Sequence, residues 1–265
     1  MENLKQIKLY LLDMDGTIYL DNELFEGTID FLEYVKSIGG RCVFLTNNSS
    51  KNVNKYIEKL SKMGICADRK DFLTSTDATV DYLKKSNYKK IFTFGTESFK
   101  EQLRESKLNI TDSLSDDVDC LCMGYDTELT YKKLEDACVL LNRDIAYVAT
   151  NPDWVCPTSY GYVPDCGSVS EMLFRATAKR PVFIGKPKPA MAKLAMKMTG
   201  FDRSETAVVG DRLYTDILCG INAKISTIYV LSGEGTKEDI VEYKIYPNFI
   251  FNNIKELTET IVRES

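Results

Sequence analysis

The stretch KLYLLDMDGTIYL, residues 8–20, places a run of apolar side chains directly before two acidic ones. Asp13 and Asp15 follow that run two positions apart, and Gly16 comes next. Residues i and i+2 of a strand lie on the same face, so both carboxylates could point into one pocket. Two carboxylates so near to each other repel, and the pKa of one of them would rise unless a cation lies between them. A hard cation bound by oxygen atoms, such as Mg²⁺, would satisfy the pair.

By itself, an Asp-x-Asp pair is weak evidence for a site. Aspartate and glycine are turn residues, so a solvated turn would explain the pair as well. The same pattern recurs at Asp117 and Asp119, where it indicates a loop. The apolar run before Asp13 and the freedom of Gly16 to adopt unusual backbone angles favour the site.

Short apolar runs alternate along the chain with segments whose apolar residues recur every three or four positions. Strands that are apolar on both sides and alternate with helices predict a parallel sheet covered on both faces. The expected fold class is therefore α/β, a doubly wound, Rossmann-like core whose ligand site lies beyond the carboxyl ends of the strands. The expected strands are residues 8–13, 41–47, 90–95, 120–125, 146–151, 181–186, 206–211, 226–231 and 248–251.

The 265-residue chain is long enough for two domains. The polar and charged residues that directly follow apolar runs, and could form a site, occur near the start of the chain and again after position 185. The block between them has strand and helix signals of its own and is long enough to be an inserted domain. We therefore predict a catalytic core formed by 1–78 and 182–265 and an inserted α/β domain formed by 79–181.

Composition narrows the partners and the chemistry. The net charge of −5, spread without a basic block, argues against nucleic acid or an anionic membrane surface. No apolar run reaches membrane-spanning length, and the N-terminus lacks the features of a secretory signal, so a cytoplasmic location is expected. The eight cysteines are expected to be reduced core thiols. The chain contains no histidine, which leaves carboxylates, lysine and hard cations to carry any chemistry.

Three further strand ends offer groups that match the acidic pair. Thr46, Asn47 and Asn48 present a hydroxyl and amides suited to phosphate oxygens, and Lys186 supplies a positive charge. Another carboxylate, Asp211, follows a later strand, and Thr215 and Asp216 begin the next helix. Each signal is weak alone, but four ordered strand ends form a specific constellation.

In this constellation the chain resembles the haloacid dehalogenase superfamily, whose four motifs match DMDGT (13–17), LTNN (45–48), Lys186 and GDRLYTD (210–216). The stretch from AYVATNPDWVCP to PDCGS, residues 146–168, also resembles the inserted C2-type cap of its NagD-like, 4-nitrophenylphosphatase-type members. The resemblance implies an enzyme, a Mg²⁺-dependent phosphomonoesterase acting on a small phosphorylated metabolite.

The resemblance also implies a role for each motif residue. Asp13 would attack phosphorus to form an aspartyl phosphate, and Asp15 would act as general acid and base. Mg²⁺ would be held by Asp13, by the backbone carbonyl of Asp15 and by Asp211. The remaining roles are phosphate binding by Thr46, Asn47, Asn48 and Lys186, and support of the carboxylates by Thr17 and Asp216.

Alternatives on related chemistry stay open at this point. In P-type ATPases the second aspartate is replaced by a residue that cannot shuttle a proton, whereas Asp15 favours turnover. A receiver domain typically takes its paired acids from adjacent positions. A catalytically weak protein that binds a phosphate ligand, or regulates through one, would keep the fold.

The inserted domain is expected to determine substrate choice. Its loop at 151–168 carries Trp154, Cys156 and Asp165, which we expect to face the leaving group. Trp154 could stack on a substrate ring or simply pack within the cap. The cap could also form the interface of a homo-oligomer.

Overall fold

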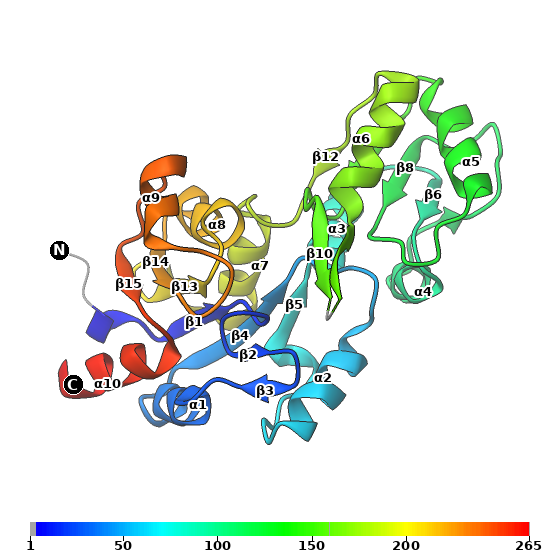
Figure 1. Cartoon of the computed structure of the whole chain (residues 1–265). Coiled ribbons are helices and arrows are strands. Elements are labelled where there is room, and N and C mark those ends of the chain that lie inside the picture. The colour runs from blue at the N-terminus through cyan, green and yellow to red at the C-terminus, as the bar shows by residue number, and fades with distance from the viewer. Residues whose placement is uncertain (1–3, 159, 265) are drawn as a thin grey trace. The chain divides into compact units, whose positions relative to one another are not determined.

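The computed structural model describes residues 4–158 and 160–264, which divide into two compact units (Figure 1). The core unit comprises the chain up to Thr46, Val53–Leu73 and the chain from Lys186 onward. The inserted unit comprises Asn47–Asn52 and Thr74–Gly185. The division into domains 1–78 with 182–265 and 79–181 remains a prediction beside these contact-based units.

The core unit is built on a six-stranded sheet with the order β15-β14-β13-β1-β4-β5. Strands β1, β4, β13, β14 and β15 pair in parallel, with β1 between β13 and β4. A short antiparallel hairpin, β2–β3, follows β1. The strand bounds are β1 Leu9–Leu12, β2 Tyr19–Leu20, β3 Glu23–Leu24, β4 Arg41–Thr46, β5 Phe72–Thr74, β13 Thr206–Gly210, β14 Ser226–Val230 and β15 Phe249–Phe251.

The central strands β1, β13 and β14 are buried on both faces, which explains why their sequences are mostly apolar. Tyr10 and Leu12 of β1 join a core cluster with side chains of α1, α2 and α10, whereas Leu9 and Leu11 are buried on the opposite face. The helices are α1 Thr28–Ser37, α2 Val53–Lys62, α7 Ala190–Thr199, α8 Leu218–Ala223, α9 Lys237–Tyr243 and α10 Ile254–Glu264, with the 3-10 helices η1 Leu4–Gln6 and η2 Arg69–Asp71 and the π-helix η3 Leu213–Ile217.

The inserted unit has a sheet and a core of its own. Its five strands have the order β12-β9-β8-β6-β7 and pair in parallel, and β10 and β11 form a separate antiparallel hairpin. The bounds are α3 Ser75–Lys85, β6 Ile91–Phe94, α4 Glu97–Glu105, β7 Ile110–Thr111, β8 Cys120–Met123, α5 Tyr131–Leu141, β9 Ala146–Ala149, β10 Val155–Thr158, β11 Gly161–Pro164, α6 Cys166–Thr177 and β12 Val182–Phe183.

The predicted α/β class and parallel sheets are confirmed. Every expected strand is present, shortened by one to four residues at its ends. None of the cysteines among the described residues forms a disulfide, and four of them are buried. Within the described part of the chain, no helix is both long and apolar enough to cross a membrane.

Candidate active site

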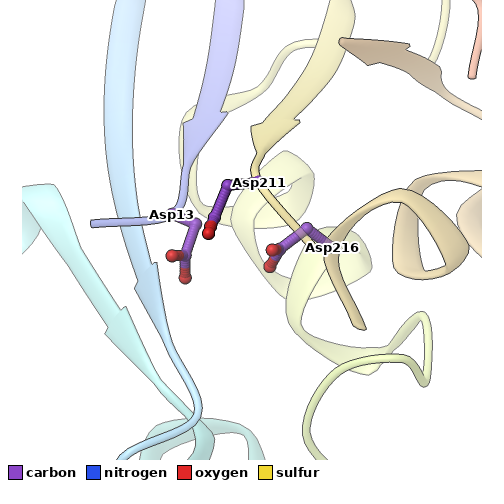
Figure 2. A group of neighbouring side chains, drawn as sticks. All are labelled: Asp13, Asp211 and Asp216. Atoms are coloured by element: carbon purple, nitrogen blue, oxygen red, sulfur yellow. The ribbon is translucent and has the colours of Figure 1, made fainter. Parts of the chain in front are cut away.

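Two carboxylates lie at the carboxyl ends of adjacent parallel strands. Asp13 follows β1, and its backbone N–H donates to the carbonyl of Val209 in β13. Asp211 directly follows β13, and Asp216 lies one turn further along, on η3. Figure 2 shows the side chains of Asp13, Asp211 and Asp216 pointing toward a common region, and one oxygen of each lies within 4.8 Å of the others.

The Lys186 ammonium, also in the core unit, contacts two carboxylates of this cluster. Its Nζ donates to Oδ1 of Asp13 at 2.5 Å and to Oδ1 of Asp216 at 2.6 Å. Both the lysine and Asp216 are almost fully buried, whereas the Asp13 side chain is 17% exposed. The cluster therefore presents one partly accessible carboxylate, held by a buried cation.

Asp211 is held in place by neighbours on both of its oxygens. The Thr17 hydroxyl donates to Oδ1 at 3.3 Å, and the backbone N–H of Glu234 donates to Oδ2 at 2.8 Å. Two glycines permit this packing: a Cβ on Gly16 would lie 2.4 Å from Oδ2, and one on Gly233 would lie 2.0 Å from it. Gly16 also has a φ of 82°, which side-chain-bearing residues rarely adopt.

The charges of the cluster oppose one another. Burial raises the pKa of Asp13 well above its usual range, Lys186 opposes that shift, and Asp216 and Asp211 add to it. Burial, reinforced by Asp216, raises the pKa of Asp211 to about 6. Burial disfavours the charged form of Lys186, but Asp13 and Asp216 outweigh it and raise the pKa of its ammonium group.

This donor set suits a hard divalent cation. Lys186 contacts two of the three carboxylates, and Arg212 places a second positive charge near Asp13 and Asp211, so three carboxylates still outnumber two cations. Oxygen atoms are the ligands that divalent cations of this kind prefer. A divalent cation here would also favour the ionised carboxylates and reverse the pKa shifts of Asp13 and Asp211. The cluster also contains Asp216, which the sequence predicts as a support of the carboxylates. Coordination of the metal by the backbone carbonyl of Asp15 remains a prediction.

The side chain of Asp15 lies apart from this carboxylate cluster. It is 55% exposed, with Oδ1 3.6 Å from the Nζ of Lys59 and Oδ2 accepting from the Tyr19 hydroxyl at 3.3 Å. The two aspartates at the end of β1 therefore occupy different environments, one inside the cluster and one at the surface of the core unit.

Of the predicted phosphate-binding residues at the end of β4, one is assigned to the core unit and two to the inserted unit. Thr46 ends β4 in the core unit, whereas Asn47 and Asn48 belong to the inserted unit. The Asn47 amide donates to Asp153, and the Asn48 side-chain oxygen accepts from the backbone and the hydroxyl of Ser50. Phosphate binding by these residues remains a prediction.

The three predicted specificity residues have unlike surroundings within the inserted unit. Trp154 is 60% exposed just before β10, and Cys156 is partly buried against the unit's core. Asp165 is buried, caps the N-terminus of α6 through Cys166 and accepts from the amide of Asn151. Asp165 therefore has a structural role that the sequence analysis did not anticipate.

Sequence reasoning missed the residues that hold the predicted site residues in place. Glu234 and Gly233 lie in the SGEG turn after β14, and a strand end followed by two glycines is a signal that could have identified them. Tyr19 and Lys59 lie on a two-residue strand and in mid-helix, where no local pattern distinguishes them.

Comparison with known proteins agrees with this geometry. Family models described as haloacid dehalogenase-like hydrolase and HAD hydrolase-like match residues 10–109 and 183–257. The acid sugar phosphatase of Staphylococcus aureus is 34% identical over 254 residues, which are 96% of this chain and 97% of that protein.

Solved structures extend the likeness to the fold of the whole chain. The 4-nitrophenylphosphatase of Thermotoga maritima is 38% identical, with a TM-score of 0.92 over 97% of this chain and 98% of that one. NagD of Escherichia coli is 29% identical, with a TM-score of 0.86 over 94% and 98% of the two chains. The chain therefore belongs to the haloacid dehalogenase superfamily, as a hydrolase among its NagD-like phosphatases.

Proposed function

We propose that this phosphatase hydrolyses monoesters of small phosphorylated metabolites through a Mg²⁺-dependent aspartyl phosphate on Asp13. The observation that carries the proposal is the cluster of Asp13, Asp211 and Asp216 around the buried ammonium of Lys186. Asp13 is the cluster carboxylate that retains side-chain exposure, so it is the one that substrate can reach.

The first half-reaction transfers the phosphoryl group to the protein. An oxygen of Asp13 attacks phosphorus, a new O–P bond forms, and the ester O–P bond breaks. Asp15 gives its proton to the departing ester oxygen, which leaves as an alcohol. Lys186 stabilises the negative charge that the reacting group brings to Asp13. A Mg²⁺ ion held by Asp13 and Asp211 would supply further charge neutralisation.

The second half-reaction returns the protein to its starting state. Asp15, now ionised, takes a proton from water as the water oxygen attacks the phosphorus of the aspartyl phosphate. The O–P bond to Asp13 breaks, inorganic phosphate leaves, and both aspartates recover their original protonation. Thr46 and Asn47, with Asn48 nearby, are proposed to hold the phosphoryl oxygens in both halves.

The names of the relatives support phosphorylated small molecules as substrates. The acid sugar phosphatase and the 4-nitrophenylphosphatase are named for small phosphorylated compounds. We propose that a C2-type cap, predicted at 79–181, selects among such compounds. A ligand-binding protein without turnover is disfavoured, because Asp13, Asp15, Lys186 and Asp211 are all present.

The test is phosphate release from 4-nitrophenyl phosphate by the purified full chain, measured against Mg²⁺ concentration. Activity should rise with Mg²⁺, disappear in excess chelator and return when Mg²⁺ is restored. Asp13→Asn should abolish turnover, whereas Lys188→Met, an exposed change two positions from Lys186, should leave it unchanged. Full activity in excess chelator would disprove the metal assignment, and wild-type turnover by Asp13→Asn would disprove the nucleophile.

A further inference from the structure

Two side chains of the core unit contact the Asp15 carboxylate at different oxygens. The Tyr19 hydroxyl donates to Oδ2 at 3.3 Å, and the Lys59 ammonium lies 3.6 Å from Oδ1. One contact would leave the carboxylate free to rotate about it. Two contacts on separate oxygens restrict both the direction in which the group points and the tilt of its plane.

The groups that make these contacts are better fixed than Asp15 itself. Tyr19 is fully buried in the core, and the Lys59 ammonium lies 3.7 Å from the centre of its ring, a cation–π contact. Lys59 is carried by α2, which is anchored in the same core by Tyr56 and Leu60. The Asp15 side chain is 55% exposed and would otherwise sample several rotamers.

We propose that Lys59 and Tyr19 are positioning residues that hold Asp15 in the orientation its acid and base steps require. The inference rests on the function proposed above, because it assigns a partner to the proton-transfer group of that mechanism. An ion pair as exposed as this one adds little to folding stability. Its effect is therefore expected in the rate of proton transfer, where a misplaced group loses much of its efficiency.

This role predicts that the effect of losing Lys59 depends on the leaving group. Ethyl phosphate needs a proton on its departing oxygen, whereas nitrophenolate leaves readily without one. The ratio kcat/KM reports the steps up to departure of the alcohol, so the later base step of Asp15 does not enter it. The leaving group of phenyl phosphate departs more readily than that of ethyl phosphate and less readily than nitrophenolate, so the rates of slow variants stay measurable with it.

The experiment compares kcat/KM for ethyl, phenyl and 4-nitrophenyl phosphate at saturating Mg²⁺. Lys59→Met should lower the value for ethyl phosphate about tenfold, part of the ~10²–10⁴-fold that general acid catalysis contributes, and the value for 4-nitrophenyl phosphate by less than about twofold. Lys59→Arg should restore most of the loss, and Tyr19→Phe should show the same leaving-group pattern. Lys62→Met, an exposed change on the same helix, should behave like wild type for all three substrates.

A double-variant cycle shows whether Lys59 acts through Asp15. With phenyl phosphate, Lys59→Met should slow the wild-type protein but have no further effect in an Asp15→Asn background. Equal losses on all three substrates, an additive loss in that background, or no loss on ethyl phosphate would each overturn the inference. If Asp15→Asn itself hydrolysed ethyl phosphate at the wild-type rate, the proposed function would fail instead, so the two failures are distinguishable.

Discussion

In the proposed mechanism Asp13 must be ionised to attack phosphorus, yet its surroundings favour the protonated form. Burial raises its pKa, Lys186 opposes that rise, and the carboxylates of Asp216 and Asp211 add to it. A divalent cation among the three carboxylates would tip this balance toward the ionised nucleophile. The electrostatics of the residue thus explain why metal and lysine are both expected beside it.

The contribution of Asp211 to the stability of the metal-free protein should fall as the pH rises from about 4 to about 6. Burial raises the pKa of Asp211 from 3.8 to about 6, so in this range the folded state keeps a proton that the unfolded chain releases. This stabilisation is complete below about pH 4 and is lost as the pH rises through 6. The shift corresponds to about 3 kcal/mol of unfolding free energy.

Thermal unfolding in excess chelator measures this effect against Asp211→Asn, which has no carboxyl group to titrate at this position. The Tm of the wild type minus that of the variant should fall across this pH range. Adding Mg²⁺ above pH 6 should then stabilise the wild type more than the variant. A Tm difference that stayed level or rose with pH would contradict the assigned environment of Asp211.

The proposed catalytic residues were predictable one by one, because each ends an apolar run in the sequence. Asp13, Lys186 and Asp211 all follow such runs, and the structure brings them together. Lys59 was not predictable in this way. It lies 44 positions from Asp15 on an amphipathic helix with two other lysines, and only the packing of α2 selects it as the partner.

The strands and helices place these residues through a simple rule. Parallel strands end at one edge of the sheet, so adjacent β1 and β13 deliver Asp13 and Asp211 side by side. The long apolar runs made these strands visible in the sequence. The β10–β11 hairpin was not visible, because its residues alternate little in polarity and include Pro157 and Pro164.

Asp165→Ala should destabilise the inserted unit by about 1 kcal/mol, the usual effect of removing a helix N-cap. Its carboxylate accepts from the backbone of Cys166 at the start of α6 and from the Asn151 amide, and the residue is 4% exposed. Asp165→Asn keeps an acceptor and should lose less. Denaturant unfolding of both variants provides the comparison, and equal stabilities for Ala and wild type would rule out the capping role.

At the scale of the whole molecule, two units with separate sheets divide the work that we propose. The core unit contains the carboxylate cluster and Lys186, which we propose bind the phosphoryl group common to all substrates. The inserted unit carries exposed aromatic side chains at and beside its hairpin, including Trp154 and Tyr162. Composition and spacing predicted an insertion. They carry no information about the leaving group, so the natural substrate could not be predicted from the sequence.

Trp154→Ala should change the order of preference among natural phosphomonoesters more than it changes hydrolysis of acetyl phosphate. The side chain is 60% exposed, so its removal should have little effect on folding. Contacts to the leaving group discriminate between substrates, whereas acetyl phosphate offers little to contact. Tyr131→Ala, at an exposed position on α5 of the same unit, provides the control. A uniform fall of kcat/KM for every substrate would show that Trp154 does not determine substrate specificity.

The central claim is that Asp13 carries the phosphoryl group during turnover, and reductive trapping measures this directly. Asp15→Asn should accept phosphate from 4-nitrophenyl phosphate but hydrolyse the phosphoenzyme slowly, because the base for water is missing. Borohydride added to the acid-quenched mixture would reduce an aspartyl phosphate to homoserine, which peptide mass spectrometry locates. The account predicts homoserine at position 13, and none when Asp13→Asn is added to the same variant. Release of nitrophenol with no homoserine at position 13, or with homoserine at another aspartate, would contradict it.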